Sequence, residues 1–328
     1  MHSKNHSKIL VLGTGGTIAG LAPNPENSNN YKASQLGITD ILSQSGVVHD
    51  DLEWRDVAQI DSKDMGPRVW TDLLKALSAA CERPEIQAVV VTHGTDTIEE
   101  TAYLLHALGP WAKPLVLTCA MKPANAPDAD GPGNLRDALA LGRSAGIPSV
   151  SVVCAGQVHD PVHLQKIRTD QVDAFSSGPS GAWGTVVQGV WRPATKQPTA
   201  QTHIQPAVLP SIDYLLATQV WPRVEWVTNH ADNSGEIVHA LLAHSAHASV
   251  PLRGLVLAAT GSGTASVGME KALAKARAAE VKVLVCSRTA WGEAVFHQPK
   301  TWGEPISLSP AKARVALALA LMAEDEKN

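Results

Sequence analysis

The sequence contains few cysteines, and they lack the spacings that mark a metal site or a disulfide framework. Its four cysteines, Cys81, Cys119, Cys154 and Cys286, are far apart, and no two of them form a CxxC pair. Cys119, Cys154 and Cys286 lie in or at the ends of apolar, strand-like runs. We therefore expect buried free thiols, which pack as small apolar residues.

An excess of charge and long apolar runs are also missing. The net charge of −4 argues against the basic surface that nucleic acids or anionic membranes attract. No stretch approaches the roughly 20 apolar residues of a membrane span. The apolar run 9–12, which follows the basic N-terminus, is too short for a signal peptide. We predict a cytoplasmic protein that binds neither nucleic acid nor membranes.

Aromatic residues make up only 4% of the chain, but its apolar content is ordinary. Hydrophobic residues are 44% and charged residues 18% of the 328 positions. These values are typical of a folded soluble protein and argue against disorder. A chain of this length buries a large core and is expected to form two domains.

Short apolar runs alternate with helical patterns through the first part of the chain. The alternation predicts an α/β fold, with a larger N-terminal parallel-sheet domain (1–189) flanked by helices. The expected strands are 8–13, 87–92, 114–119 and 149–154, and the expected helices are 69–82, 97–108 and 134–145.

A proline-rich stretch without clear periodicity, 190–212, is predicted to be a linker. After it the alternation resumes, which predicts a smaller C-terminal α/β domain over 213–328. Its final helix should begin at Ser309 and Pro310, a capping residue followed by a proline in the first turn. The other expected elements are helices at 235–247 and 264–279 and strands at 254–259 and 281–286.

Two expected strands end in turns that are rich in glycine and threonine. The run 9–12 leads into 13–20 (GTGGTIAG), and the run 88–91 leads into 92–97 (THGTDT). Ligands of open parallel sheets bind outside the carboxyl ends of the strands, so the two turns predict one shared site. There, glycines would let backbone amides approach a ligand and stabilise an oxyanion. The alternative is a purely structural role, in which both turns only begin helices, with Asp96 or Thr97 as an N-cap.

The first turn does not fit a nucleotide-binding fingerprint. Counted from Gly13, the pattern needs glycine or alanine where Ile18 stands, and counted from Gly15 it needs glycine where Thr17 stands. No Walker lysine follows. Phosphate binding remains an alternative on strand–turn geometry alone. The polar segment 21–30 follows the turn and is expected to form a lid that Tyr31 closes.

These residues carry a resemblance to a known family. The segment 14–20 resembles the first active-site signature of the bacterial L-asparaginase/glutaminase family, and 91–102 resembles the second. The similarity extends over nearly the whole chain. Further matching segments are 61–65, 118–123, 128–135, 166–169 with 174–175, and 308–314.

The resemblance implies catalytic roles for five residues. Thr17 matches the nucleophile, which attacks the side-chain amide carbon, and Tyr31 matches the tyrosine that bonds its hydroxyl. Thr95, Asp96 and Lys166 match a second cluster, in which a lysine whose burial favours the neutral amine would activate the threonine or a water. The division of roles between Thr17 and Thr95 is left open.

The resemblance also implies how substrate is held. Ser62 matches the residue that contacts the α-carboxylate, and Asp96 the one that binds the α-ammonium. The Thr95 amide and the Ala120 carbonyl would flank the reacting amide. Lys63 replaces a glutamine that is common beside the carboxylate, so it either strengthens carboxylate binding or points to solvent.

The C-terminal domain departs most from the family pattern. Family sites take an asparagine and an acidic residue from the adjacent subunit. Here 261–264 (GSGT) stands where a Gly-Asn-Gly-Asn turn is expected, and Glu293 is the candidate acidic residue. The family's usual assembly implies a homotetramer built from dimers.

The thirteen histidines show no metal-ligand spacing, and we expect His159, His163 and His203 at the surface. The predicted reaction needs no metal and no organic cofactor. It is the hydrolysis of L-asparagine to L-aspartate and ammonia through a threonine acyl-enzyme. Two alternatives remain, namely an amidohydrolase that prefers L-glutamine and a catalytically weak amino-acid-binding protein on the same scaffold.

Overall fold

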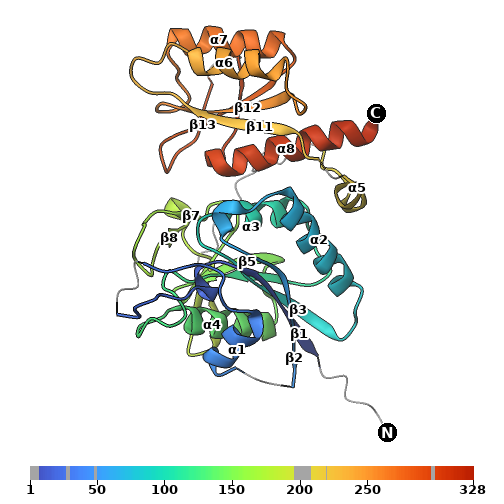
Figure 1. Cartoon of the computed structure of the whole chain (residues 1–328), viewed down its shortest axis with the longest axis vertical. Coiled ribbons are helices and arrows are strands. Elements are labelled where there is room, and N and C mark those ends of the chain that lie inside the picture. The colour runs from blue at the N-terminus through green and yellow to red at the C-terminus, as the bar shows by residue number, and fades with distance from the viewer. Residues whose placement is uncertain (1–6, 27–29, 48–49, 196–207, 219, 297–299) are drawn as a thin grey trace. The chain divides into compact units, whose positions relative to one another are not determined.

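The computed structural model describes residues 7–26, 30–47, 50–195, 208–218, 220–296 and 300–328. The chain divides into a larger unit, Met1–Thr199, and a smaller one, Ala200–Asn328. Both are layered α/β structures, as predicted from the alternation of apolar runs and helical patterns (Figure 1). None of the helices in the described ranges is both long and apolar enough to cross a membrane.

The larger unit is built on an eight-stranded sheet in the order β10-β9-β6-β5-β4-β3-β1-β2. The neighbours from β5 to β2 pair in parallel, whereas β5-β6, β6-β9 and β9-β10 pair antiparallel. The bounds are β1 Lys8–Gly15, β2 Leu52–Ile60, β3 Ile86–Thr92, β4 Leu115–Thr118, β5 Val150–Cys154, β6 Gln157–His159, β9 Gly184–Val187 and β10 Val190–Pro193.

Helices cover both faces of this sheet (Figure 1). Helices α1 (Ile38–Ser45) and α4 (Gly131–Arg143) pack together on one face, and α2 (Pro67–Cys81) and α3 (Ile98–Ala107) cover the other. Alternate β1 residues such as Ile9 and Val11 join the core beneath α1 and α4, because successive strand side chains point to opposite faces. Both faces being covered explains why β1 and β3 are almost continuously apolar.

The order of the strands creates a switch point between β1 and β3. From β1 the chain passes to β2 on one side, and it then crosses to β3 on the other side of β1. In open α/β sheets, ligands bind at such a point, outside the carboxyl ends of the strands. The turns after β1 and β3 are the two that the sequence singles out.

The smaller unit has a four-stranded parallel sheet in the order β11-β12-β13-β14. Helices α6 and α7 lie on one face and α8 on the other, as Figure 1 shows. The N-cap of α8 is Ser309 with Pro310 in the first turn, as predicted. The bounds are α5 Ile212–Ala217, β11 Arg223–Thr228, α6 Glu236–Ser245, β12 Leu252–Ala259, α7 Val267–Ala278, β13 Lys282–Ser287, β14 Glu304–Pro305 and α8 Pro310–Lys327.

The expected linker differs from what the structure describes at its two ends. Residues Val190–Pro193 form β10, which pairs with β9, and α5 begins at Ile212. Strand β10 forms a tight hairpin with β9 through Gln188 and Gly189, which both have positive φ, and a strand of four residues is too short to show a clear periodic signal. Residues 196–207 lie outside the described ranges, so their role as a linker stays a prediction.

Candidate active site

The turn after β1 places Thr17 at the edge of the sheet. Gly15 and Gly16 have φ values of 98° and 84°, a left-handed conformation that glycine adopts without strain. Thr17 then begins a short 3₁₀ turn, η1 (Thr17–Ala19), and its side chain is buried. Its Oγ1 lies 2.8 Å from the hydroxyl oxygen of Tyr31, so the two hydroxyls share a hydrogen bond.

The segment that carries Tyr31 is closed at its base by paired hydrogen bonds. Leu21 and Lys32 exchange two backbone bonds of 3.0 and 2.9 Å. Ala22 exchanges two bonds of 2.8 Å with the side chain of Asn125. These contacts fix where the segment leaves and rejoins the unit. Residues 27–29 of the expected lid lie outside the described ranges, so its closing motion stays a prediction.

The turns after β1, β2 and β3 are in direct contact. A Cβ on Gly16 would lie 2.3 Å from the Cα of Gly94, and a Cβ on Gly94 would lie 2.4 Å from the Oγ of Ser62. The Thr14 hydroxyl also donates to the Thr92 carbonyl at 3.0 Å. The glycines therefore allow the two signature turns and Ser62 to share one place, as the sequence predicts.

Ser62 lies in the 3₁₀ turn η2 (Ser62–Asp64) and is bound to the turn after β3 at two points. Its Oγ accepts the Asp96 amide at 3.3 Å, and its carbonyl accepts the Thr97 hydroxyl at 2.7 Å. Thr97 occupies the N-cap position of α3, but its side chain makes no capping hydrogen bond. The turn after β3 is thus hydrogen-bonded to Ser62. A turn that only capped α3 would not need these bonds.

Lys166 joins the second turn from far along the chain. It lies in β7 (Gln165–Lys166), which pairs with β8 (Phe175–Ser176). Its Nζ donates to Thr95 Oγ1 at 2.9 Å and to Asp96 Oδ1 at 2.6 Å. The lysine side chain is 20% exposed and the Asp96 carboxylate is half-exposed. The structure therefore assembles the expected cluster of threonine, aspartate and lysine.

His93 is a buried residue of this turn that the sequence did not single out. Its Nδ1 lies 2.8 Å from the Gly94 carbonyl, which only accepts, so Nδ1 carries the proton. Its Nε2 then accepts from Thr101 at 2.9 Å, and Thr101 accepts the Trp70 indole at 2.9 Å. Burial lowers the pKa of His93 to about 4. The neutral ring thus anchors the Gly94 peptide to α2 and α3.

Ala120 follows β4 and is fully buried. Its loop is held by Asp130, whose carboxylate accepts the amides of Met121 and Lys122, each at 2.9 Å. Burial raises the pKa of Asp130, although these amides favour the ionised form. Asn134 donates to the Cys119 carbonyl at 2.9 Å. The backbone on both sides of Ala120 is therefore held by hydrogen bonds.

Family models match nearly the whole chain. Residues 8–198 match the N-terminal asparaginase domain, and residues 223–328 match the C-terminal domain of glutaminases and asparaginases. The chain belongs to the asparaginase family.

Relatives and a solved structure agree with this assignment. A protein of Haemophilus influenzae named as a probable periplasmic L-asparaginase is 32% identical over 95% of this chain and 88% of its own length. A glutaminase-asparaginase of Pseudomonas fluorescens biotype A is 29% identical over 96% of this chain and 86% of its own length. The crystal structure of a probable cytoplasmic L-asparaginase from Campylobacter jejuni has a TM-score of 0.86 and 31% identity, and the match covers 98% of each chain. The asparaginase-family chain is therefore an amidohydrolase.

Besides Asp96, two other expected substrate-binding residues of this asparaginase-family chain, Lys63 and Glu293, are exposed. Lys63 pairs with Asp61 at 2.6 Å and with Asp64 at 3.5 Å, which favours the solvent-facing alternative. The pairing with Asp61 raises the pKa of Lys63. Glu293 lies in the smaller unit, and its role at a subunit interface stays a prediction.

The prediction that His159 and His163 lie at the surface is wrong. His159 is buried, its Nδ1 lies 2.9 Å from Ser177 Oγ, and burial lowers its pKa to about 4. His163 is half-buried beside Asp160, with Nδ1 3.0 Å from that carboxylate. Strand β6 carries His159 into the interior. His203 lies outside the described ranges.

Within those ranges, no group of three or more histidine, cysteine or acidic residues is arranged to hold a metal.

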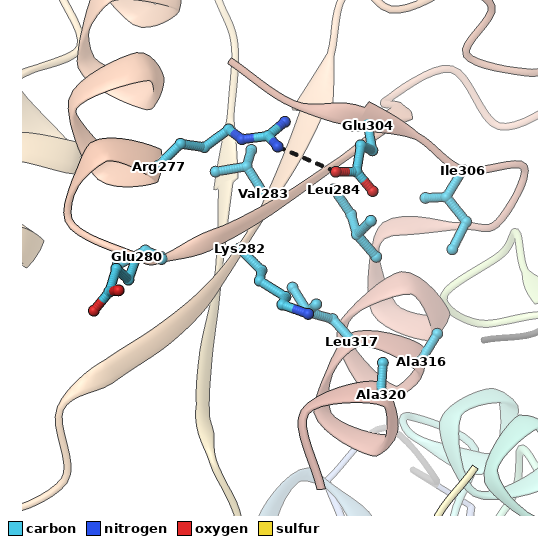
Figure 2. Close-up of a pocket in the computed structure, with 11 residues that line it drawn as sticks. Arg277, Glu280, Lys282, Val283, Leu284, Glu304, Ile306, Ala316, Leu317 and Ala320 are labelled. Carbon is cyan, nitrogen blue, oxygen red and sulfur yellow. Dashed lines mark hydrogen bonds and ion pairs between the residues drawn. The ribbon is translucent and has the colours of Figure 1, made fainter. Parts of the chain in front are cut away.

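The smaller unit of the asparaginase-family chain contains a separate cavity of about 410 Å³ between α7, β13, β14 and α8. Figure 2 shows Arg277 reaching toward Glu304, and their side chains form an ion pair at 3.2 Å. Most of the other lining side chains are aliphatic, and Lys282 is paired with Glu324. Two of its four charged lining residues, Arg277 and Glu304, are paired with each other, and none of the described residues that line the cavity carries a hydroxyl like that of Thr17.

Proposed function

We propose that this amidohydrolase is an L-asparaginase that converts L-asparagine and water to L-aspartate and ammonia. The observation that carries the proposal is the hydrogen bond between Thr17 Oγ1 and the Tyr31 hydroxyl, at 2.8 Å. It lies where the turns after β1, β2 and β3 meet. A threonine hydroxyl is a weak nucleophile unless a neighbouring group takes its proton. Tyr31 is the group in contact with it.

The charges around the second turn support a zwitterionic amino-acid substrate. The half-exposed Asp96 carboxylate offers a partner for the α-ammonium. Ser62 contacts the Asp96 amide and offers its hydroxyl to the α-carboxylate. Binding both charged groups would fix the side-chain amide in one orientation, which lowers the entropy cost of the reaction.

In the first step, Thr17 Oγ1 attacks the carbon of the side-chain amide. The hydroxyl proton passes through Tyr31 to the amide nitrogen, the C–N bond breaks, and ammonia leaves. The Thr95 amide stabilises the developing oxyanion, and the Ala120 carbonyl accepts from the leaving nitrogen. The product is a β-aspartyl ester on Thr17.

In the second step, water hydrolyses that ester. Thr95 and Lys166, in contact at 2.9 Å, orient the water. Lys166 receives the water proton as the neutral amine, the form that is favoured when the substrate ammonium rather than the lysine is paired with Asp96. The ester C–O bond breaks, the Thr17 oxygen regains a proton, and L-aspartate is released. Binding of a substrate ammonium to Asp96 would compete with the Lys166 ion pair and couple substrate binding to this step.

L-glutamine hydrolysis is the second candidate function. A relative of similar identity and coverage carries the name glutaminase-asparaginase, which favours it. The alternative of a weak amino-acid-binding protein is less well supported, because Thr17, Tyr31, Thr95, Asp96 and Lys166 form the contacts that chemistry needs.

Rapid-quench mass spectrometry with L-asparagine tests the proposal. We expect an aspartyl adduct on the peptide that contains Thr17, absent in Thr17→Ala and still formed in Thr185→Ala, whose side chain is exposed on β9. An adduct on Thr95 instead would overturn the assignment of the nucleophile. Turnover of the Thr17→Ala variant at the normal rate would overturn it as well.

The assembly and the cellular compartment also belong to this proposal. The family resemblance supports a homotetramer, which light scattering on the purified chain tests directly, since a monomeric mass would contradict it. The solved neighbour is described as cytoplasmic, but one relative is named periplasmic. Fractionation of cells that express the chain distinguishes the two compartments.

A further inference from the structure

Two buried cysteines lie side by side at the carboxyl ends of β4 and β5. Thr118 and Val153 are partners in the parallel ladder, so Cys119 and Cys154 are the next pair along it. The two sulfur atoms are 3.0 Å apart. The residues are 1% and 4% exposed, and both are free thiols.

The backbone at this point is compatible with a disulfide. Neighbouring strands in a sheet are about 4.8 Å apart, and disulfides form between Cα atoms roughly 4.4–6.8 Å apart. Partners in a ladder project side chains to the same face. The two sulfurs need to approach by only about 1 Å to reach the bond length of a disulfide.

Cys154 also borders a small hollow. It lines a hollow with Gln157, His159, Asp173 and Phe175 whose volume is about 10 Å³. A volume of roughly 10–15 Å³ on this scale is what one water molecule needs. The hollow therefore has room for about one water molecule, which excludes a peptide disulfide such as glutathione and leaves the smallest oxidants, such as hydrogen peroxide, as the candidates.

We propose that Cys119 and Cys154 form an oxidative modification site, at which hydrogen peroxide converts the two thiols to a disulfide. The Cys154 sulfur attacks one peroxide oxygen, the O–O bond breaks, and a sulfenic acid and one water form. The Cys119 sulfur then attacks the Cys154 sulfur, the S–O bond breaks, and the Cys119 proton leaves in a second water. Two thiols and one peroxide thus give one disulfide and two waters.

The reaction is expected to be slow. Burial raises the pKa of the Cys119 thiol well above its usual range, and the contact with Cys154 acts in the same direction. The thiolate is the nucleophile in thiol chemistry, so little of the reactive form is present at neutral pH. The charge of Lys166 acts in the opposite direction, but its effect is smaller.

The disulfide would join two strand ends that also hold the candidate site. Asn134 donates to the Cys119 carbonyl at 2.9 Å and accepts the Ala155 amide at 3.0 Å, so it already bridges these ends. Ala120 follows Cys119 directly. If Ala120 flanks the reacting amide, a consequence that rests on the proposed function, movement of Cys119 toward Cys154 lowers turnover.

The test treats the folded full-length chain with hydrogen peroxide, alkylates the remaining thiols under denaturing conditions and maps the peptides by mass spectrometry. We expect a peptide pair linked through Cys119 and Cys154, and dithiothreitol should remove this link. Buried Cys286 should remain a free thiol during the peroxide treatment and therefore be alkylated. Cys154→Ser and Cys119→Ala should each reduce the linked peptide at least about tenfold, and the matched control Cys286→Ser should leave it unchanged. Circular dichroism checks that each variant is folded.

Three results overturn the proposal. These are full alkylation of both cysteines after treatment, sulfinic acid at Cys154 without a link, and a link from Cys119 to Cys81. Ammonia release is measured on the same samples as a separate readout. A loss that dithiothreitol reverses supports the effect on the site, and unchanged release overturns that effect but not the disulfide. If no sample releases ammonia, the proposed function fails while the peptide map still decides the modification.

Discussion

Thr17 Oγ1 lies 2.8 Å from the Tyr31 hydroxyl, although Thr17 is only 6% exposed and Tyr31 is 37% exposed. The bond joins the buried end of β1 to a segment that leaves the unit and returns at Lys32. The buried Thr17 hydroxyl is thus hydrogen-bonded to Tyr31, a side chain that is partly exposed to solvent. This relationship gives Thr17 a route by which its proton can leave.

Replacing Tyr31 by phenylalanine removes that route and keeps the ring. We expect kcat for L-asparagine to fall by about 10²–10³-fold, because proton transfer by a positioned side chain contributes effects of this size. KM should change little, since the hydroxyl contacts Thr17 rather than the charged groups of the substrate. Steady-state ammonia release measures both. Tyr214→Phe, in α5 of the smaller unit, is the matched control, and an equal loss there would contradict the role of Tyr31.

Lys166→Met should lower the rate by about 10³-fold or more, because Thr95 loses the amine bonded to it. The stability should change modestly, since the side chain is partly exposed. Lys75→Met removes an exposed lysine paired with Asp72 on α2 and serves as the control. A loss of less than about tenfold in the Lys166 variant would exclude the lysine from proton transfer.

Gly16→Ala should destabilise the larger unit and abolish turnover. Its Cβ would lie 2.3 Å from the Gly94 Cα, and its φ of 84° is unfavourable for alanine. Backbone strain of this kind costs about 1–3 kcal/mol, and the clash with Gly94 adds to it. Gly133→Ala is the control, since its Cβ would meet nothing within 4 Å. Thermal unfolding and ammonia release are the measurements, and a Gly16→Ala variant that resembles Gly133→Ala would refute the close contact of the two turns.

The free energy of unfolding should fall as the pH falls from about 6.5 toward about 4. Burial lowers the pKa values of His93 and His159 to about 4 from the ordinary value of 6.5. Between these limits the unfolded chain binds protons that the native chain does not, so stability is present above pH 6.5 and is lost toward pH 4. The loss is on the order of 3 kcal/mol for each histidine.

Urea denaturation at about pH 7 and about pH 4.5 checks this prediction. His159→Gln should remove roughly half of the part of the pH dependence that comes from these two histidines. His247→Gln, at an exposed position, should keep the wild-type dependence. An unchanged slope in the His159 variant would mean that this histidine is not buried neutral in the native state.

Much of the fold could be predicted because apolar runs and turn residues are local signals. The runs at 9–12 and 88–91 become β1 and β3, and the turns that follow them meet at the switch point. Strand β2 could not be predicted in this way. It lies at the edge of the sheet and exposes Glu53–Asp56 to varying degrees, so its sequence has no continuous apolar run.

The site depends on contacts that local patterns cannot show. Lys166 reaches Thr95 across 71 positions through the two-residue strand β7, which has no periodicity of its own. Only the resemblance to the family pointed to it. His159 was misplaced for a related reason, since a polar stretch does not reveal that tertiary packing buries one of its members.

The most direct test of the account is ammonia release from L-asparagine and L-glutamine, measured side by side for the wild-type chain and Thr17→Ala. The account predicts fast release from L-asparagine by the wild type and none above background by a folded variant that still binds L-aspartate. Release mainly from L-glutamine would contradict the substrate assignment. Wild-type release by Thr17→Ala would contradict the central claim that Thr17 is the nucleophile.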